Sequence, residues 1–218
     1  MSTGQIMPKG KFILSDYEIF VLGLGYSPSN VVQFNVLMFP PWYPLDRGKD
    51  GFWIAGGKLQ TLPPRGTFQG ISIGADYMSF PSFESDIRPA GASVGSSSTF
   101  QRWLSTNVAG SIGSRSMKIH LNYAHVWQTA PSTSSSFLFQ AGAEFLLVSK
   151  NDDDGLEAMA ETWFAPGSRE QFRFTTLIVG LRAWAIGAAI DLGWPFFSDE
   201  GEPMRIYPVP YACVNYIL

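Results

Sequence analysis

Charged side chains are scarce in this chain of 218 residues, at 15% of the sequence against about a quarter in ordinary globular domains. The formal net charge is −3 and no basic cluster occurs, which argues against a nucleic-acid partner. A single cysteine, Cys213, rules out an internal disulfide framework and a zinc site built on cysteines. We therefore expect neither a cofactor nor a metal ion.

The chain also opens without a signal peptide, because MSTGQIMPKGK contains no apolar segment. It is therefore either cytoplasmic or the mature form of an exported protein. We expect the exported form, located in the bacterial outer membrane. Residues 1–10 are interpreted as a leader, and residues 11–218 as a single β-barrel domain.

A long uncharged stretch lies between Glu18 and Asp46, and its length would permit a membrane-spanning helix. Its centre, residues 26–30, has the sequence Tyr-Ser-Pro-Ser-Asn, which is typical of a turn. Apolar and polar residues then alternate through 32–38, with a period of two rather than 3.6. The sequence therefore predicts a hairpin here.

Aromatic residues make up 15% of the chain, and glycine (22) and proline (15) are plentiful, a balance that favours many short strands joined by turns. Short turns between consecutive strands predict an antiparallel up-and-down sheet. Its eleven candidate strands are 11–26, 31–39, 51–62, 67–80, 100–112, 116–129, 136–149, 155–165, 171–183, 187–195 and 206–218. A single-chain bacterial barrel has an even strand count, so one segment is spurious or one is missed.

The candidate strands have one apolar face and one face of glycine, small polar and ionisable residues. In 116–129 the apolar face holds Met117, Ile119, Leu121, Tyr123 and Trp127, whereas Lys118, His120 and Asn122 alternate with them. The polar face is poor in charge and suits a crowded interior better than an open surface. Aromatic residues near strand ends are typical of a barrel that crosses a bilayer. We therefore predict an all-β transmembrane barrel of about 10–12 strands.

Several stretches resemble a family of uncharacterised bacterial outer-membrane β-barrel proteins. SDYEIFVLGLGYSPSNVVQFNV (15–36) is similar to the opening hairpin of that family, and VPYACVNYIL (209–218) to its final strand. WIAGGKLQTL (53–62), ETWF (161–164) and IVGLRAWAIGAAIDLGW (178–194) also resemble it. Such barrels usually end on an aromatic residue, whereas this chain ends on Leu218. The resemblance implies a fold and a location but no activity.

Ionisable and polar residues on the inward faces are expected to pair, because unpaired charges are costly to bury. We predict a polar network in the lumen, with Glu144 and Glu161 paired to Lys118 or another base. The candidates are Lys58, Asp76, Lys118, His120, Asn122, Glu144, Glu161, Asp191, and Arg173 or Arg182.

The sequence predicts a non-enzymatic barrel, structural or porin-like, whose lumen is largely plugged. The expected partners are a lipid bilayer and a small polar solute. No oligomeric state is predicted. One alternative is a soluble all-β barrel or sandwich that binds an apolar ligand or a protein partner. Another is a lipid-modifying barrel enzyme, because His120, Asn122 and a nearby serine would imitate a hydrolase site.

Overall fold

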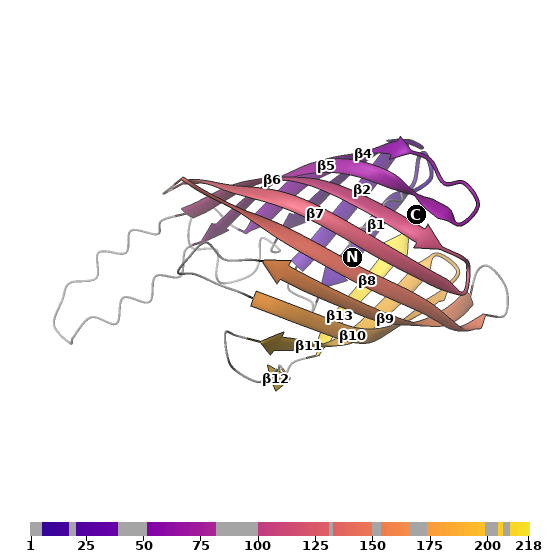
Figure 1. Ribbon diagram of the computed structural model, residues 1–218. Helices are drawn as coiled ribbons and strands as arrows, with labels where there is room; N and C mark the ends of the chain where they lie inside the picture. The colour runs from indigo at the N-terminus through magenta and orange to yellow at the C-terminus, as the bar shows by residue number, and fades with distance from the viewer. Residues whose placement is uncertain are drawn as a thin grey trace.

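The computed structural model describes residues 6–17, 21–38, 52–81, 100–130, 133–149, 154–165, 174–198, 205–206 and 210–218 (Figure 1). No helix in these ranges is long and apolar enough to cross a membrane. The strands are β1 (Phe12–Tyr17), β2 (Val21–Ser29), β3 (Val32–Met38), β4 (Trp53–Leu62), β5 (Phe68–Pro81), β6 (Phe100–Gly113), β7 (Met117–Ala130), β8 (Ser134–Ser149), β9 (Asp154–Ala165), β10 (Phe174–Ala185), β11 (Ala188–Ser198), β12 (Arg205–Ile206) and β13 (Tyr211–Ile217).

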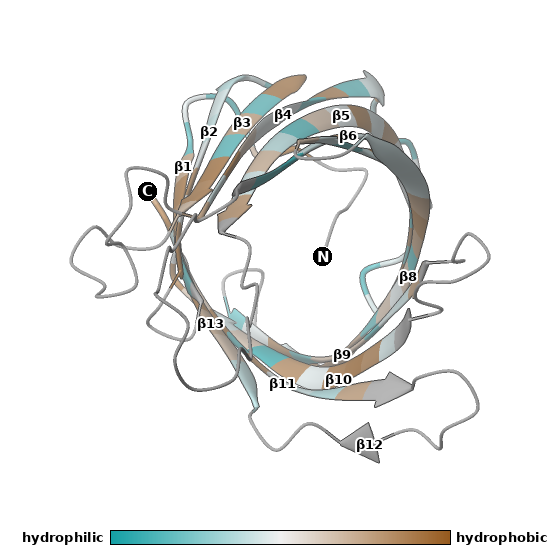
Figure 2. Cartoon of the chain, turned by 90° about the vertical axis from the view of Figure 1, so that its left-hand side faces the viewer, coloured by the Kyte–Doolittle hydropathy of each residue, from teal (hydrophilic) through white to brown (hydrophobic). Residues whose placement is uncertain are grey.

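The strands close into a ring. Each strand from β1 to β11 pairs antiparallel with the next, β11 pairs with β13, and β13 pairs with β1. The two-residue β12 pairs only with β11 and lies outside the ring. Figure 2 shows this ring viewed roughly along its axis. The predicted antiparallel up-and-down barrel is confirmed, with 12 strands in the ring.

The eleven candidate strands fall one short of the twelve in the ring because one strand was missed. The predicted strand 11–26 is two strands, since Tyr17 pairs with Val21 and Phe12 pairs with Tyr26. Residues 18–20 connect them and contain no glycine, proline or asparagine, so the turn carries none of the usual signals. At the other end of the chain, the predicted strand 206–218 pairs within the ring only from Tyr211.

The two ends of the barrel have connections of different length. One end carries the connections 30–31, 63–67, 114–116, 150–153 and 186–187. The chain ends of β1 and β13 lie at this short-turn end, where Phe12 and Leu218 exchange backbone hydrogen bonds. The opposite end carries the long connections 39–52, 82–99 and 199–210 together with the shorter connections 18–20, 131–133 and 166–173. This asymmetry is typical of outer-membrane barrels.

The barrel has no apolar core of the usual kind. Among the described residues the buried hydrophobic side chains are only Ala109, Ala124 and Cys213, whereas many polar and charged side chains are buried. Large apolar side chains point outward, and Leu121 is 61% exposed. The predicted alternation is therefore confirmed: the apolar face turns outward and the polar face lines the lumen.

Close packing of β10 against β11 gives a testable prediction. An ideal Cβ on Gly180 would lie 2.3 Å from the Leu192 carbonyl oxygen, so Gly180→Ala must displace backbone. We expect it to lower the free energy of unfolding by about 1–3 kcal/mol. Gly110→Ala is the matched control, because its Cβ would meet only the Ile71 side chain at 3.7 Å.

Thermal unfolding followed by circular dichroism measures both variants. Equal melting temperatures for Gly180→Ala and Gly110→Ala would contradict the register of β10 and β11.

Candidate functional site

Arg182 on β10 is the centre of the largest charged cluster among the lumen residues that the structure describes. Its Nε and Nη2 atoms donate to the two carboxylate oxygens of Asp191 on β11, at 2.7 and 3.0 Å. Its Nη1 atom lies 3.3 Å from Glu144 Oε1 on β8 and 3.3 Å from Glu157 Oε1 on β9. The planar guanidinium thus contacts three carboxylates on three different strands, a geometry that suits arginine better than lysine.

Glu144 extends the cluster towards β7 and β6. Its Oε2 atom lies 3.2 Å from Lys118 Nζ and 3.4 Å from His120 Nε2. His120 Nδ1 lies 2.7 Å from Ser111 Oγ on β6. Glu144 is 5% exposed and His120 is 2% exposed, so this part of the cluster is shielded from solvent.

The cluster also crosses the seam where the barrel closes. The Asn215 side chain on β13 donates to Asp191 at 3.5 Å, and Ser15 Oγ on β1 donates to Asn215 Oδ1 at 2.6 Å. Polar contacts therefore run round the wall from β6 through β13 to β1. We call this set the charged belt; its members are Ser111, Lys118, His120, Glu144, Glu157, Arg182, Asp191, Asn215 and Ser15.

Glu161 belongs to a second cluster, on the side of the belt nearer the long connections. Its carboxylate accepts hydrogen bonds from Gln140 Nε2 and Trp163 Nε1. Gln140 in turn accepts from Asn122 Nδ2 at 3.1 Å. These side chains lie on β7, β8 and β9 and fill that part of the lumen with hydrogen-bonded groups.

Asp76 on β5 forms a third cluster, across the lumen from Arg182. Its Oδ2 atom accepts from Asn107 Nδ2 at 3.1 Å and from Ser105 Oγ at 3.4 Å. Gly56 pairs with Asp76 on the neighbouring strand, and an ideal Cβ there would lie 2.0 Å from Asp76 Oδ1. The Asp76 carboxylate therefore occupies the space that a side chain on β4 would fill.

The wall across the lumen from the charged belt carries glycines at several inward positions. The inward positions of β2, β4 and β5 include Gly23, Gly25, Gly56 and Gly74. Between this glycine wall and the charged belt lies a cavity of about 580 Å³, which we call the chamber. Its polar lining includes Asn35, Lys58, Asp76, Asn107, Arg182 and Asn215.

The segment 6–11 lies at the short-turn mouth of the lumen beside the chamber. The backbone N–H of Met7 donates to Gln33 Oε1 at 3.2 Å, and that of Lys9 donates to Asn30 Oδ1 at 2.8 Å. Gly10 and Lys11 pair with Ser27 through backbone hydrogen bonds. The described part of the segment interpreted as a leader, from residue 6 onward, thus contacts the inner wall.

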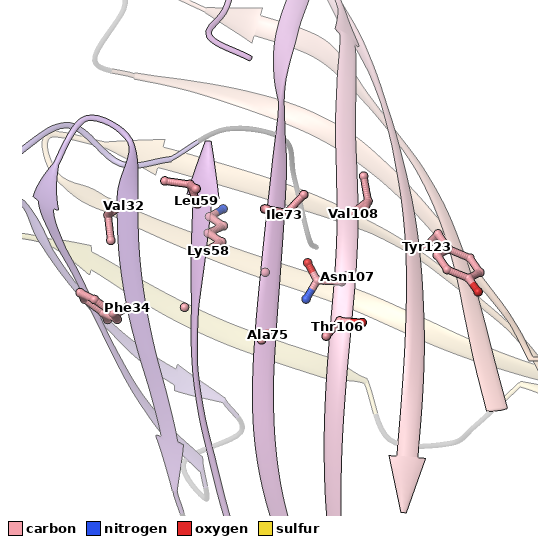
Figure 3. A pocket seen from close by; sticks show the side chains of 12 residues that line it. Val32, Phe34, Lys58, Leu59, Ile73, Ala75, Thr106, Asn107, Val108 and Tyr123 are labelled. Atoms are coloured by element: carbon pink, nitrogen blue, oxygen red, sulfur yellow. The ribbon is translucent and has the colours of Figure 1, made fainter. Parts of the chain in front are cut away.

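The outer face is hollowed as well, in a groove of about 630 Å³ over β3 to β7 (Figure 3). Its floor holds the small residues Gly57, Ala75 and Thr106, which pair in register across three strands. Apolar side chains surround them, and Lys58 and Asn107, also drawn there, belong by register to the inner face. The groove is a depression in an apolar surface and gathers no catalytic groups.

All of the predicted lumen residues lie at inward positions, but they fall into three clusters rather than one. Lys118, His120, Glu144 and Asp191 lie in the charged belt, Asn122 and Glu161 in the second cluster, and Lys58 and Asp76 beside the chamber. The predicted pairing of Glu144 with Lys118 is present. Of the two candidate arginines, Arg182 is the central base, and Arg173 lies outside the described residues.

Sequence reasoning missed Glu157, Ser15 and Asn215. Glu157 shares its face with Glu161, four residues along the same strand, so the period of two should have included it. Ser15 and Asn215 come together because β1 pairs with β13. The alternation of residues within a single strand does not predict that pairing. Within the described ranges no group of His, Cys, Asp or Glu side chains could hold a metal ion.

No protein-family model matches this chain, and no curated protein matches it in sequence. The family resemblance of 15–36 and 209–218 therefore stays a prediction, and the site is interpreted from its geometry alone.

The charged belt predicts unequal effects of removing its two long bases. Arg182→Met would leave the carboxylates of Asp191, Glu144 and Glu157 without their shared partner, and we expect a loss of about 3–5 kcal/mol in the free energy of unfolding. Lys118→Met is the matched control: Lys118 is 30% exposed, and Glu144 would keep His120 and Arg182. A loss of about 1 kcal/mol or less is expected there.

Chemical denaturation of both variants in the same detergent or buffer measures the difference. A loss for Lys118→Met as large as that for Arg182→Met would show that the belt is not centred on the guanidinium.

Proposed function

We propose that this protein is a bacterial outer-membrane barrel without enzymatic activity, structural or porin-like, whose lumen is largely filled. The observation that carries the proposal is the direction of its two faces. Large apolar side chains cover the outside, whereas serine, glutamine and carboxylate side chains are buried inside. A soluble barrel would turn its apolar face inward and present charge to water.

The exposed apolar surface supports the membrane proposal. Phe34, Ile112 and Leu121 are each more than half exposed, and they lie on β3, β6 and β7 within one continuous sheet. Soluble monomers rarely expose apolar patches larger than a few hundred Å². A hydrocarbon solvent removes the cost of that exposure, and closure of the sheet leaves no unpaired edge facing lipid.

Most strands are also long enough to cross a bilayer, although β1, β3 and β13 have only 6, 7 and 7 residues. A tilted transmembrane strand needs about 9–11 residues, and strands β4 to β11 have 10 to 16. The short turns at one end and longer connections at the other match the two sides of an outer membrane.

The lumen is obstructed rather than open. The charged belt and the Glu161 cluster occupy the wall from β6 to β11, and the segment 6–11 contacts the wall at the short-turn mouth. A barrel of this size encloses far less space than the larger porins. We therefore expect a small conductance, or none, in planar bilayers.

A substitution at Leu121 tests the membrane proposal. Leu121→Lys places a charge on the outer face of β7, and we expect it to oppose insertion by about 2–4 kcal/mol if the site lies at the midplane. Leu121→Met should insert like the parent, because it keeps an apolar side chain of similar volume.

Folding into lipid vesicles, followed by the shift in gel mobility between unheated and heated samples, measures insertion. A Leu121→Lys protein that inserts as readily as the parent would refute the proposal. A parent that is monodisperse in plain buffer would favour the soluble alternative.

One observation favours an enzyme as the second candidate. Ser111 contacts His120, and His120 contacts Glu144. A serine nucleophile, its base and an orienting acid would be arranged in the same way. Asn122, which was predicted to join that site, bonds Gln140 instead. Ser111 lies inside β6 with both neighbouring strands paired at its position, and Glu144 is shared with Lys118 and Arg182. Hydrolysis also requires donors aimed at an oxyanion, and strand pairing occupies the local backbone.

We therefore expect no covalent labelling of the folded parent by a fluorophosphonate probe. Labelling of the parent that disappears in Ser111→Ala and persists in Ser105→Ala would establish the hydrolase instead.

A further inference from the structure

We infer that the chamber binds a small, uncharged, hydroxyl-rich solute with the chemistry of a monosaccharide or disaccharide. The inference deepens the proposed function, on which it rests, by naming the class of solute that a porin-like lumen of this kind would hold. It starts from the size of the chamber, the pairing of its charges and the amide groups left on its wall.

The size of the chamber suits a small organic solute. Its volume of about 580 Å³ falls within the range of about 300–1,000 Å³ that is usual for ligand sites. The wall opposite the charged belt carries glycines, so neighbouring side chains pack directly against its backbone. At Gly25, for example, an ideal Cβ would lie 2.6 Å from the Ile13 side chain and 3.3 Å from Asn35 Oδ1.

The four charged side chains that line the chamber, Lys58, Asp76, Arg182 and Asp191, have no net formal charge, and both carboxylates accept hydrogen bonds from the protein. Asp191 accepts two hydrogen bonds from Arg182 and one from Asn215. Asp76 accepts from Asn107 and Ser105. A charged solute would have to give up its hydration and compete with these contacts, which is costly in a partly buried site. The chamber therefore favours a solute without net charge.

Two amide side chains present hydrogen-bonding groups with no partner among the described residues. Asn35 accepts from Gln33 through Oδ1 at 2.8 Å, which leaves its Nδ2 donors for a solute. Asn107 donates to Asp76 through Nδ2, which leaves its Oδ1 as an acceptor. A hydroxyl group both donates and accepts, so it can satisfy either amide. A hydroxyl-rich solute can satisfy both at once.

The lining is not uniformly polar. Leu37, Ile54 and Tyr211 contribute apolar surface to the same chamber, towards the end with the longer connections. The C–H faces of a sugar ring pack against such surface while its hydroxyl groups reach the amides. This combination distinguishes a sugar from a small ion or from urea-sized polar molecules, which would leave the apolar part uncovered.

The experiment is isothermal titration of glucose and maltose into the folded protein, with glucuronate and glucosamine as charged probes. We expect saturable binding of at least one neutral sugar at one site per chain, and binding of both charged sugars weaker by about tenfold or more. Asn35→Leu removes the amide donors and should weaken neutral-sugar binding by about tenfold, the loss expected for one or two hydrogen bonds. Asn35→Ala provides the same test if the leucine variant does not fold.

Asn122→Leu is the matched control, because Asn122 is also an inward amide but lies in the Glu161 cluster outside the chamber. It should leave the affinity unchanged. The inference is overturned if the folded parent binds neither neutral sugar, if the charged sugars bind as tightly, or if Asn122→Leu weakens binding as much as the Asn35 variants do.

These outcomes are separable from those of the membrane proposal. Binding is measured on folded protein in micelles, or in buffer if the protein proves soluble, whereas the proposed function is tested by insertion into vesicles. A barrel that inserts but binds no sugar overturns only this inference, and a barrel that binds sugar but does not insert overturns only the location.

Discussion

The pairing of β13 with β1 is the constraint on which the rest of the structure depends. It joins the two ends of the sheet, so that every strand of the ring has two neighbours and no edge is left to pair with another chain. Closure also makes the two faces of the sheet unequal, since one face surrounds a narrow lumen and the other meets the surroundings. Period-two alternation then places most of the large apolar side chains on the outer face.

Charges in such a lumen are tolerated only where they are paired. Arg182 pairs with Asp191, Glu144 and Glu157. The Asn215 amide and the Ser15 hydroxyl then extend the hydrogen bonds across the seam between β13 and β1. The wall opposite carries glycines, against which Ile13, Asn35 and Asp76 pack closely. The chamber lies between this wall and the charged belt.

Much of this architecture could be predicted from the sequence, because alternation is a local property. The faces of β5, β7, β8 and β11 follow directly from which residues alternate, and the pairing of Lys118 with Glu144 follows from strands that are neighbours along the chain. The division of residues 11–26 into β1 and β2 could not be predicted, because residues 18–20 carry no turn signal. The contact of Ser15 with Asn215 depends on the pairing of the first and last strands. The chamber depends on which walls of the barrel face each other. Neither feature leaves a pattern in any short stretch of the sequence.

The central claim is that the apolar face of the closed barrel meets lipid and the polar face does not. Phe34 and Asn35 on β3 test it most directly, because these adjacent residues lie at the same depth and point to opposite faces. A small fluorophore is attached at Phe34→Cys or at Asn35→Cys in a Cys213→Ala background, and its quenching by brominated lipid is measured in vesicles. The account predicts strong quenching at position 34 and weak quenching at position 35. Equal quenching at both positions, or stronger quenching at position 35, would contradict it.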